Sequence, residues 1–168
     1  MLETDRLSLR PWRVSDAAFH RRLWLERDPR VPPHRRIDAN GRPTVAELED
    51  RIRALPEDAP LRLLVVELSA TGEPIGYCGL IENAALPPDE PEIAYELLRG
   101  HWGAGYATEA ASAVVELARA SGYPRLWATV RAWNTSSLRV LAKLGFAETG
   151  RVEADPVHGD SLCMMRNL

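Results

Sequence analysis

The residue types with the clearest chemical use lie in one glycine-rich stretch, Arg99 to Ala110, which reads Arg-Gly-His-Trp-Gly-Ala-Gly-Tyr-Ala-Thr-Glu-Ala. It follows an extended-looking run, Glu92 to Leu98, and leads into an alanine-rich run with helical spacing. Glycines let the backbone approach a ligand closely, and the first turn of a helix presents unpaired N–H groups to an anion. The stretch therefore predicts a strand-to-helix turn that binds a phosphate-bearing ligand.

Two common phosphate-binding motifs do not fit this turn. A Walker P-loop needs a lysine after its glycines, and none follows here, because Lys143 is the only lysine of the chain. A dinucleotide fingerprint needs a third glycine where Thr108 stands. It also needs an acidic residue at the end of the next strand, where the chain has Thr129, Val130 and Arg131. The remaining interpretation is a pyrophosphate site for a different cofactor.

Composition limits the classes of protein that can carry this turn. At 168 residues with 45% hydrophobic content, the chain suits a single domain over residues 1–168. The net charge is -3 and no segment is basic enough for nucleic-acid binding. No apolar run reaches the ~20 residues that span a bilayer, and the N-terminus lacks a signal-peptide pattern. We expect a cytoplasmic protein with no metal, no nucleic-acid partner and no membrane contact.

The residues before the glycine turn show strand and helix patterns. We expect strands over residues 6–10, 61–68, 74–82 and 92–98, and helices over residues 15–27 and 44–55. Between the two helices, Arg27 to Pro43 combines prolines, a glycine and several arginines, which predicts an irregular loop. Its basic side chains fit either a solvated surface or a site for an acidic substrate.

After the turn, the pattern predicts a helix that ends at Gly122. A strand over 125–132 and a helix over 135–144 follow, and two strands over 146–152 and 162–168 end the chain. Strands and helices mixed in this order indicate an α/β domain.

Three motifs, in this order, resemble those of the GNAT superfamily of acyl-CoA-dependent N-acyltransferases. They are Trp102-Gly-Ala-Gly-Tyr-Ala-Thr-Glu-Ala110, Asn134-Thr-Ser-Ser137 and Leu141-Ala-Lys-Leu-Gly-Phe146. The opening segment, Leu2 to Trp12, is similar to the branch that includes the ribosomal-protein alanine N-acetyltransferases. The resemblance covers nearly the whole chain. It implies a mostly antiparallel sheet of six to seven strands, splayed between the fourth and fifth, with about four flanking helices.

The resemblance also implies acetyl-CoA as the acyl donor, with its pantetheine along the fourth strand and its pyrophosphate on the glycine turn. The pantetheine would be lined by Leu97, Leu98 and Arg99. The pyrophosphate would be held by amides of Trp102, Gly103, Ala104, Gly105, Tyr106 and Ala107. Trp102 stands where the family usually has Gln or Arg, so the phosphates depend more on backbone N–H groups. Arg99 is a candidate to compensate for the missing polar side chain.

Catalytic roles follow from the same resemblance. Asn134 matches an asparagine that contacts the cofactor, although Asn before a helix is also a favoured N-cap. Leu141 stands where many relatives have a tyrosine acid, and Ser137 matches a serine assigned that role in the ribosomal-protein branch. Among carboxylates, Glu92 matches the family position of the base, with three others as alternatives: Glu96, Glu153 and Asp160.

The sequence therefore predicts an N-acetyltransferase whose acceptor is a primary amine, either a peptide N-terminus or a small molecule. The amine would attack the thioester directly. The alternative is a catalytically silent CoA-binding sensor or scaffold, since the tyrosine acid is missing. A homodimer is compatible with the sequence, but no pattern encodes one.

Overall fold

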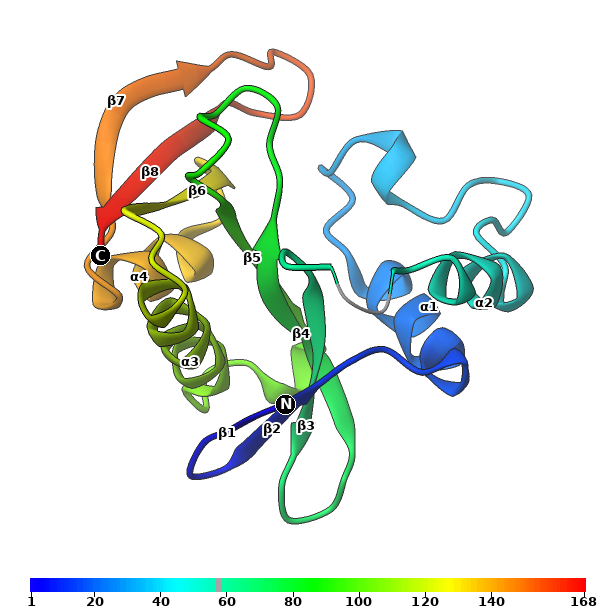
Figure 1. Cartoon of the computed structure of the whole chain (residues 1–168). Coiled ribbons are helices and arrows are strands. Elements are labelled where there is room, and N and C mark those ends of the chain that lie inside the picture. The colour runs from blue at the N-terminus through cyan, green and yellow to red at the C-terminus, as the bar shows by residue number, and fades with distance from the viewer. Residues whose placement is uncertain (57–58) are drawn as a thin grey trace.

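The computed structural model describes residues 1–56 and 59–168 (Figure 1). In these residues the strands form one sheet in the order β1-β2-β3-β4-β5-β6-β8-β7. The strands are β1 (Leu2–Glu3), β2 (Leu7–Arg10), β3 (Leu63–Leu68), β4 (Pro74–Ile81), β5 (Glu92–Leu97), β6 (Arg125–Arg131), β7 (Ala147–Glu153) and β8 (Ser161–Asn167). The α-helices are α1 (Ala17–Glu26), α2 (Val45–Arg53), α3 (Tyr106–Ala120) and α4 (Thr135–Lys143). Turns of 3-10 helix are η1 (Val14–Asp16), η2 (Pro33–Arg35) and η3 (Arg99–His101).

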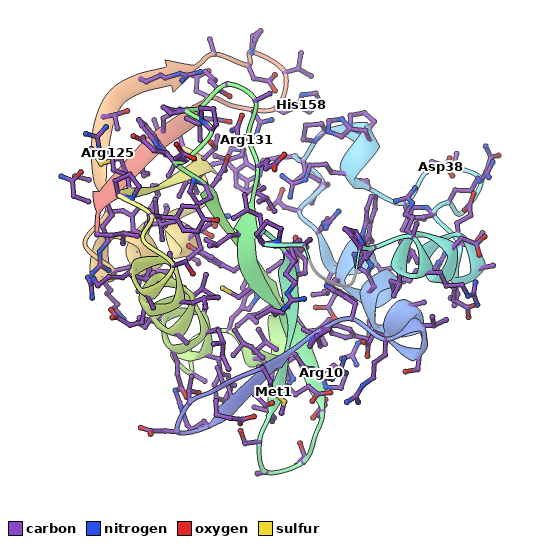
Figure 2. All side chains as sticks on the ribbon, in the orientation of Figure 1. Met1, Arg10, Asp38, Arg125, Arg131 and His158 are labelled. Atoms are coloured by element: carbon purple, nitrogen blue, oxygen red, sulfur yellow. The ribbon has the colours of Figure 1, made fainter. Side chains whose placement is uncertain are left out.

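Helices cover both faces of this sheet, with α1 and α2 on one side and α3 and α4 on the other (Figure 1). Strand alternation explains the two layers, because successive side chains point to opposite faces. Tyr77 of β4 packs with Leu23 of α1, whereas the next residue, Cys78, joins the core under α3. Side chains fill the space between α3 and the sheet (Figure 2), and the small side chains of the alanine-rich helix are buried there: Ala110, Ala111, Val114 and Ala118.

The observed elements agree with the expected mixed α/β class. The expected splay between the fourth and fifth predicted strands, which are β5 and β6 in the structure, is also confirmed. The described residues form eight strands rather than six to seven. The additional strand is β1, which pairs Leu2 with Leu9 and Glu3 with Ser8. Two residues are too short to show an alternating pattern, so the sequence carried no signal for this strand. No helix in the described ranges is long and apolar enough to cross a membrane.

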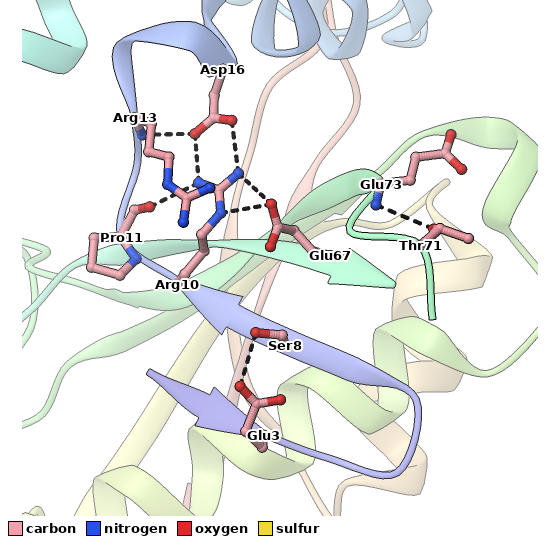
Figure 3. A network of polar contacts seen from close by, with 9 residues as sticks. All are labelled: Glu3, Ser8, Arg10, Pro11, Arg13, Asp16, Glu67, Thr71 and Glu73. Carbon is pink, nitrogen blue, oxygen red and sulfur yellow. Dashed lines mark hydrogen bonds and ion pairs between the residues drawn. The ribbon is translucent and has the colours of Figure 1, made fainter. Parts of the chain in front are cut away.

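A buried ion network holds α1 against the sheet (Figure 3). The guanidinium of Arg10, at the end of β2, binds both carboxylate oxygens of Asp16 at 2.7 and 2.9 Å. The same guanidinium lies 2.5 Å from the carboxylate of Glu67 on β3. Arg10 and Asp16 are each only 5% exposed. Because Asp16 directly precedes α1, this network fixes where α1 leaves the sheet.

Candidate functional site

Strands β5 and β6 form a fork. They run parallel and, within residues 1–56 and 59–168, share a single register pair, Glu92 with Trp127. The carboxylate of Glu92 occupies the closed end of the fork, where it accepts hydrogen bonds from the Thr129 amide at 2.8 Å and the Asn83 side chain at 2.7 Å. Glu92 is 8% exposed. Beyond this point the edge of β5 that faces β6 lacks a strand partner among the described residues, so the backbone there is open to an extended ligand.

The glycine turn follows the open end of β5. Gly103 and Gly105 have φ of 78° and 87°, a backbone region that L-residues with side chains rarely adopt. Helix α3 begins directly afterwards at Tyr106. In the part of the chain that the structure describes, no acceptor is found for the amides from Gly103 to Thr108. The turn therefore presents a run of free donors at a helix N-terminus, which is a favourable place for an anion.

The Trp102 amide differs from the other amides predicted to bind the pyrophosphate. It donates to the carbonyl of Arg99 at 3.1 Å, so it is already used inside the turn. The indole Nε1 of Trp102 donates to the carbonyl of Leu97 at 2.7 Å, and the residue is 56% exposed. This hydrogen bond fixes the ring at the end of β5, beside the predicted path of the pantetheine.

Two arginines lie near the turn with different roles. The Arg99 Nε donates to the carbonyl of Glu26 at 2.7 Å, which ties this side chain to the end of α1. Arg6 instead lies against the turn itself, because its Nη1 donates to the carbonyl of Ala104 at 3.1 Å. An ion pair of 2.6 Å to Glu109 on α3 holds Arg6 there. Arg6 is thus a cation at the predicted phosphate site that sequence reasoning missed, since nothing near residue 6 indicates a contact with residue 104.

The first turn of α4 lies across the fork from β5. The side-chain oxygen of Asn134 accepts from the Ser137 amide at 3.2 Å, so Asn134 caps the helix. The Tyr95 hydroxyl on β5 donates to the Ser137 carbonyl at 3.2 Å, which joins the two sides of the fork. Burial raises the pKa of Tyr95 to about 12, so its hydroxyl stays a donor at neutral pH. Leu141 is 1% exposed and belongs to the core.

On the other face of the sheet, the Arg27 to Pro43 loop is anchored to β5. Arg27 donates to Glu96, with 2.6 Å between Nη2 and Oε2, and the Tyr77 hydroxyl donates to the same carboxylate at 2.8 Å. The Arg27 guanidinium also stacks on Trp24, with Cζ 4.2 Å from the ring centroid. The side chain of Arg27 is 8% exposed, so this arginine is not part of a solvated surface.

A hollow of about 390 Å³ lies beside this loop. Its lining carries both signs of charge: Arg36, Arg42 and Arg51 against Asp38 and Glu47. Arg42 and Glu47 form an ion pair with each other. For Arg36 of this loop, the two predicted alternatives of a solvated loop surface and an acidic-substrate site both remain.

Comparisons of the sequence and of the fold with known proteins add further evidence. A family described as "Acetyltransferase (GNAT) domain" matches residues 6–147. An uncharacterized N-acetyltransferase, p20 of Bacillus licheniformis, is 30% identical over 157 residues, which cover 89% of this chain and 83% of that protein. RimJ of Mycobacterium smegmatis, solved in complex with CoA-disulfide, is 28% identical with a TM-score of 0.76, covering 96% of this chain and 81% of RimJ. A putative GnaT-family acetyltransferase from Bordetella pertussis is 25% identical with a TM-score of 0.75, and 98% of each chain is covered.

Proposed function

This chain belongs to the GNAT family of N-acetyltransferases, and from that premise we propose that it transfers an acetyl group from acetyl-CoA to a primary amine. The observation that carries the proposal is the run of free amides from Gly103 to Thr108 at the open end of the β5–β6 fork. Acyl-CoA is the donor that the family uses. The acceptor is a peptide N-terminus or a small-molecule amine.

In this proposal the donor lies in the fork. Its pantetheine runs along β5 past Leu97, Leu98 and Arg99, and its pyrophosphate accepts from the amides that start at Gly103. Arg6 adds positive charge beside the turn. Because Asn134 uses its side-chain oxygen as the helix cap, its amide nitrogen is the group left to contact the donor.

The reaction needs no covalent enzyme intermediate. The amine nitrogen attacks the thioester carbonyl carbon, a β5 amide stabilises the oxyanion, and the C–S bond breaks to release the CoA thiolate. We assign to the hydroxyl of the half-buried Ser137, which lies beside Tyr95, the return of a proton to that sulfur. A thiol has a pKa near ~8.5, so the thiolate needs only modest help in leaving at neutral pH.

Two measurements test the proposal. Calorimetry should detect binding of CoA, and absence of binding would refute the site. Thiol release from acetyl-CoA should then appear with at least one member of a panel of peptide, polyamine and amino-sugar amines. Binding without turnover on any amine would instead identify a silent CoA-binding module.

A variant pair tests the role of Ser137. Ser137→Ala should lower kcat while leaving CoA binding intact, because it removes the only hydroxyl proposed to protonate the sulfur. Ser136→Ala is the matched control, since Ser136 is exposed on the same turn of α4. Equal rates in the two variants would remove the acid role from Ser137.

A further inference from the structure

The loop between β7 and β8 holds an imidazole–carboxylate pair. The Nδ1 of His158 lies 3.2 Å from the Asp155 carboxylate, and the two side chains are 23% and 26% exposed. The other oxygen of Asp155 accepts from the backbone amides of Val157 and His158 at 3.1 and 2.9 Å. These hydrogen bonds, led by the one from the His158 amide, lower the pKa of Asp155 to about 2. Asp155 is therefore charged and orients the imidazole with Nδ1 as the donor.

This loop is fixed to the end of β6 (Figure 2). Arg131 binds the Asp155 carboxylate at 3.0 Å and the carbonyl of Gly159. The indole Nε1 of Trp133 donates to the His158 carbonyl at 2.8 Å. Gly159 lies so close to this indole that a Cβ there would be 2.7 Å from the ring. The backbone that carries His158 is therefore held by contacts on both sides of the imidazole–carboxylate pair.

The corner between β6 and α4 connects the β7–β8 loop to the segment that carries the proposed acid. Trp133, which binds the His158 carbonyl, directly precedes Asn134 and the first turn of α4, where Ser137 lies. The Arg30 guanidinium stacks on Trp133 with Cζ 4.1 Å from the ring centroid, so the Arg27 to Pro43 loop also reaches this corner. The β7–β8 loop and the Arg27 to Pro43 loop thus meet at Trp133, directly before α4.

The carboxylates predicted as bases are already engaged. Both oxygens of Glu92 accept hydrogen bonds inside the fork, and Glu96 is bound by Arg27 and Tyr77. Asp160 accepts from the Asp155 amide at 3.0 Å. Glu153 lies 3.5 Å from Arg151 on exposed β7. By contrast, no partner is found for the Nε2 of His158 in residues 1–56 and 59–168.

We propose that His158 is the general base of the acetyl transfer, an inference that rests on the proposed function. The Nε2 atom takes one proton from the ammonium form of the acceptor, and Asp155 stabilises the resulting imidazolium. The neutral amine then forms the C–N bond as the C–S bond breaks, and the thiolate receives a proton from Ser137 or water. The imidazolium returns its proton to solvent, so atoms and charge balance.

The acceptor amine explains why such a base is useful. At pH 7 an α-amine with pKa ~8 costs about 1.4 kcal/mol to deprotonate, whereas a lysine-like amine with pKa ~10.4 costs about 4.6 kcal/mol. The charged group in contact with the imidazole is Asp155, which in turn contacts Arg131 and Asp160, while Arg30 stacks on the neighbouring Trp133. A base that accepts this proton therefore helps most at a pH below the pKa of the amine.

The test compares pH–rate profiles of His158→Gln and the unaltered protein, with an acceptor that the amine panel identifies. We expect kcat at pH 7 to fall at least about 100-fold, with the KM for acetyl-CoA unchanged. The loss should shrink as the pH approaches the pKa of the amine, because the free amine needs no base. Added imidazole should restore part of the rate. Val157→Ala, a change at the exposed neighbour in the same loop, should leave the profile unaltered.

Asp155→Asn provides a second variant if His158→Gln proves unstable. The amide would oppose the Nδ1 donor, so kcat should again fall with the same pH dependence. An equal loss at every pH, or an unchanged kcat in either variant, would overturn the role of His158 while leaving the acetyl transfer in place. Absence of transfer by the unaltered protein would overturn the proposed function and this inference together.

Discussion

Replacing Gly103 with alanine should separate backbone strain from ligand binding, because a second glycine of the chain provides a matched control. Gly103 and Gly122 have φ of 78° and 82°, and a Cβ added to either meets no protein atom within 4 Å. A left-handed conformation costs an L-residue roughly 1–2 kcal/mol, so both variants should lose that much stability. For a chain of this size, the melting temperature should then fall by about 2–8 °C in each variant.

The two variants should differ in their affinity for CoA. At Gly103 the new methyl group projects into the open space where the pyrophosphate is proposed to lie, whereas Gly122 ends α3 at the opposite end of the helix. We expect Gly103→Ala to weaken CoA binding at least tenfold, which is about 1.4 kcal/mol, and Gly122→Ala to leave it unchanged. Calorimetry well below both melting temperatures measures this difference. Equal CoA affinities in the two variants would refute the assignment of the phosphate site to this turn.

Three further predictions concern stability and charge. Asp16→Ala should lower the free energy of unfolding by about 3–5 kcal/mol in urea titrations, because it leaves the buried Arg10 guanidinium without its principal partner. His20 should make the protein acid-sensitive: burial lowers its pKa from 6.5 to about 4, so the unfolded chain binds a proton that the folded one does not. The free energy of unfolding therefore has its full value, as far as His20 is concerned, above pH 6.5 and decreases as the pH falls. At pH 5 the loss should reach about 2 kcal/mol, and His20→Leu should remove most of this slope between pH 7 and 5. Arg6→Gln should weaken CoA binding several-fold at low salt and less at high salt, measured by calorimetry at two ionic strengths.

Local patterns predicted much of the fold. The helix expected over residues 44–55 begins with a capping box, a motif of local spacing in which Thr44 and Glu47 exchange hydrogen bonds of 2.8 and 3.2 Å. Helix α3 starts after the glycine turn and ends before Gly122. These features depend on residues within one or two turns of each other, so periodicity and capping chemistry are sufficient to find them.

Contacts between distant residues could not be predicted in this way. The ion pair of Arg27 with Glu96 links positions 69 residues apart, and the hydrogen bond from Thr129 to Glu92 links positions 37 apart. Neither pair shares a local pattern, because the sheet brings them together only after folding. The catalytic roles of Glu92 and Ser137, and contact of Asn134 with the donor, stay predictions.

The contact between the N-terminal hairpin and α3 has a consequence for synthesis of the chain. The Arg6 amide donates to the Glu109 carboxylate across 103 residues of sequence, and the Thr4 hydroxyl donates to the same group at 2.6 Å. During translation at roughly 5–20 residues per second, these donors wait about 5–20 s for their acceptor. A nascent chain that stops short of Glu109 therefore has β1 and β2 without their attachment to α3, so chain length itself determines when the proposed donor site can form.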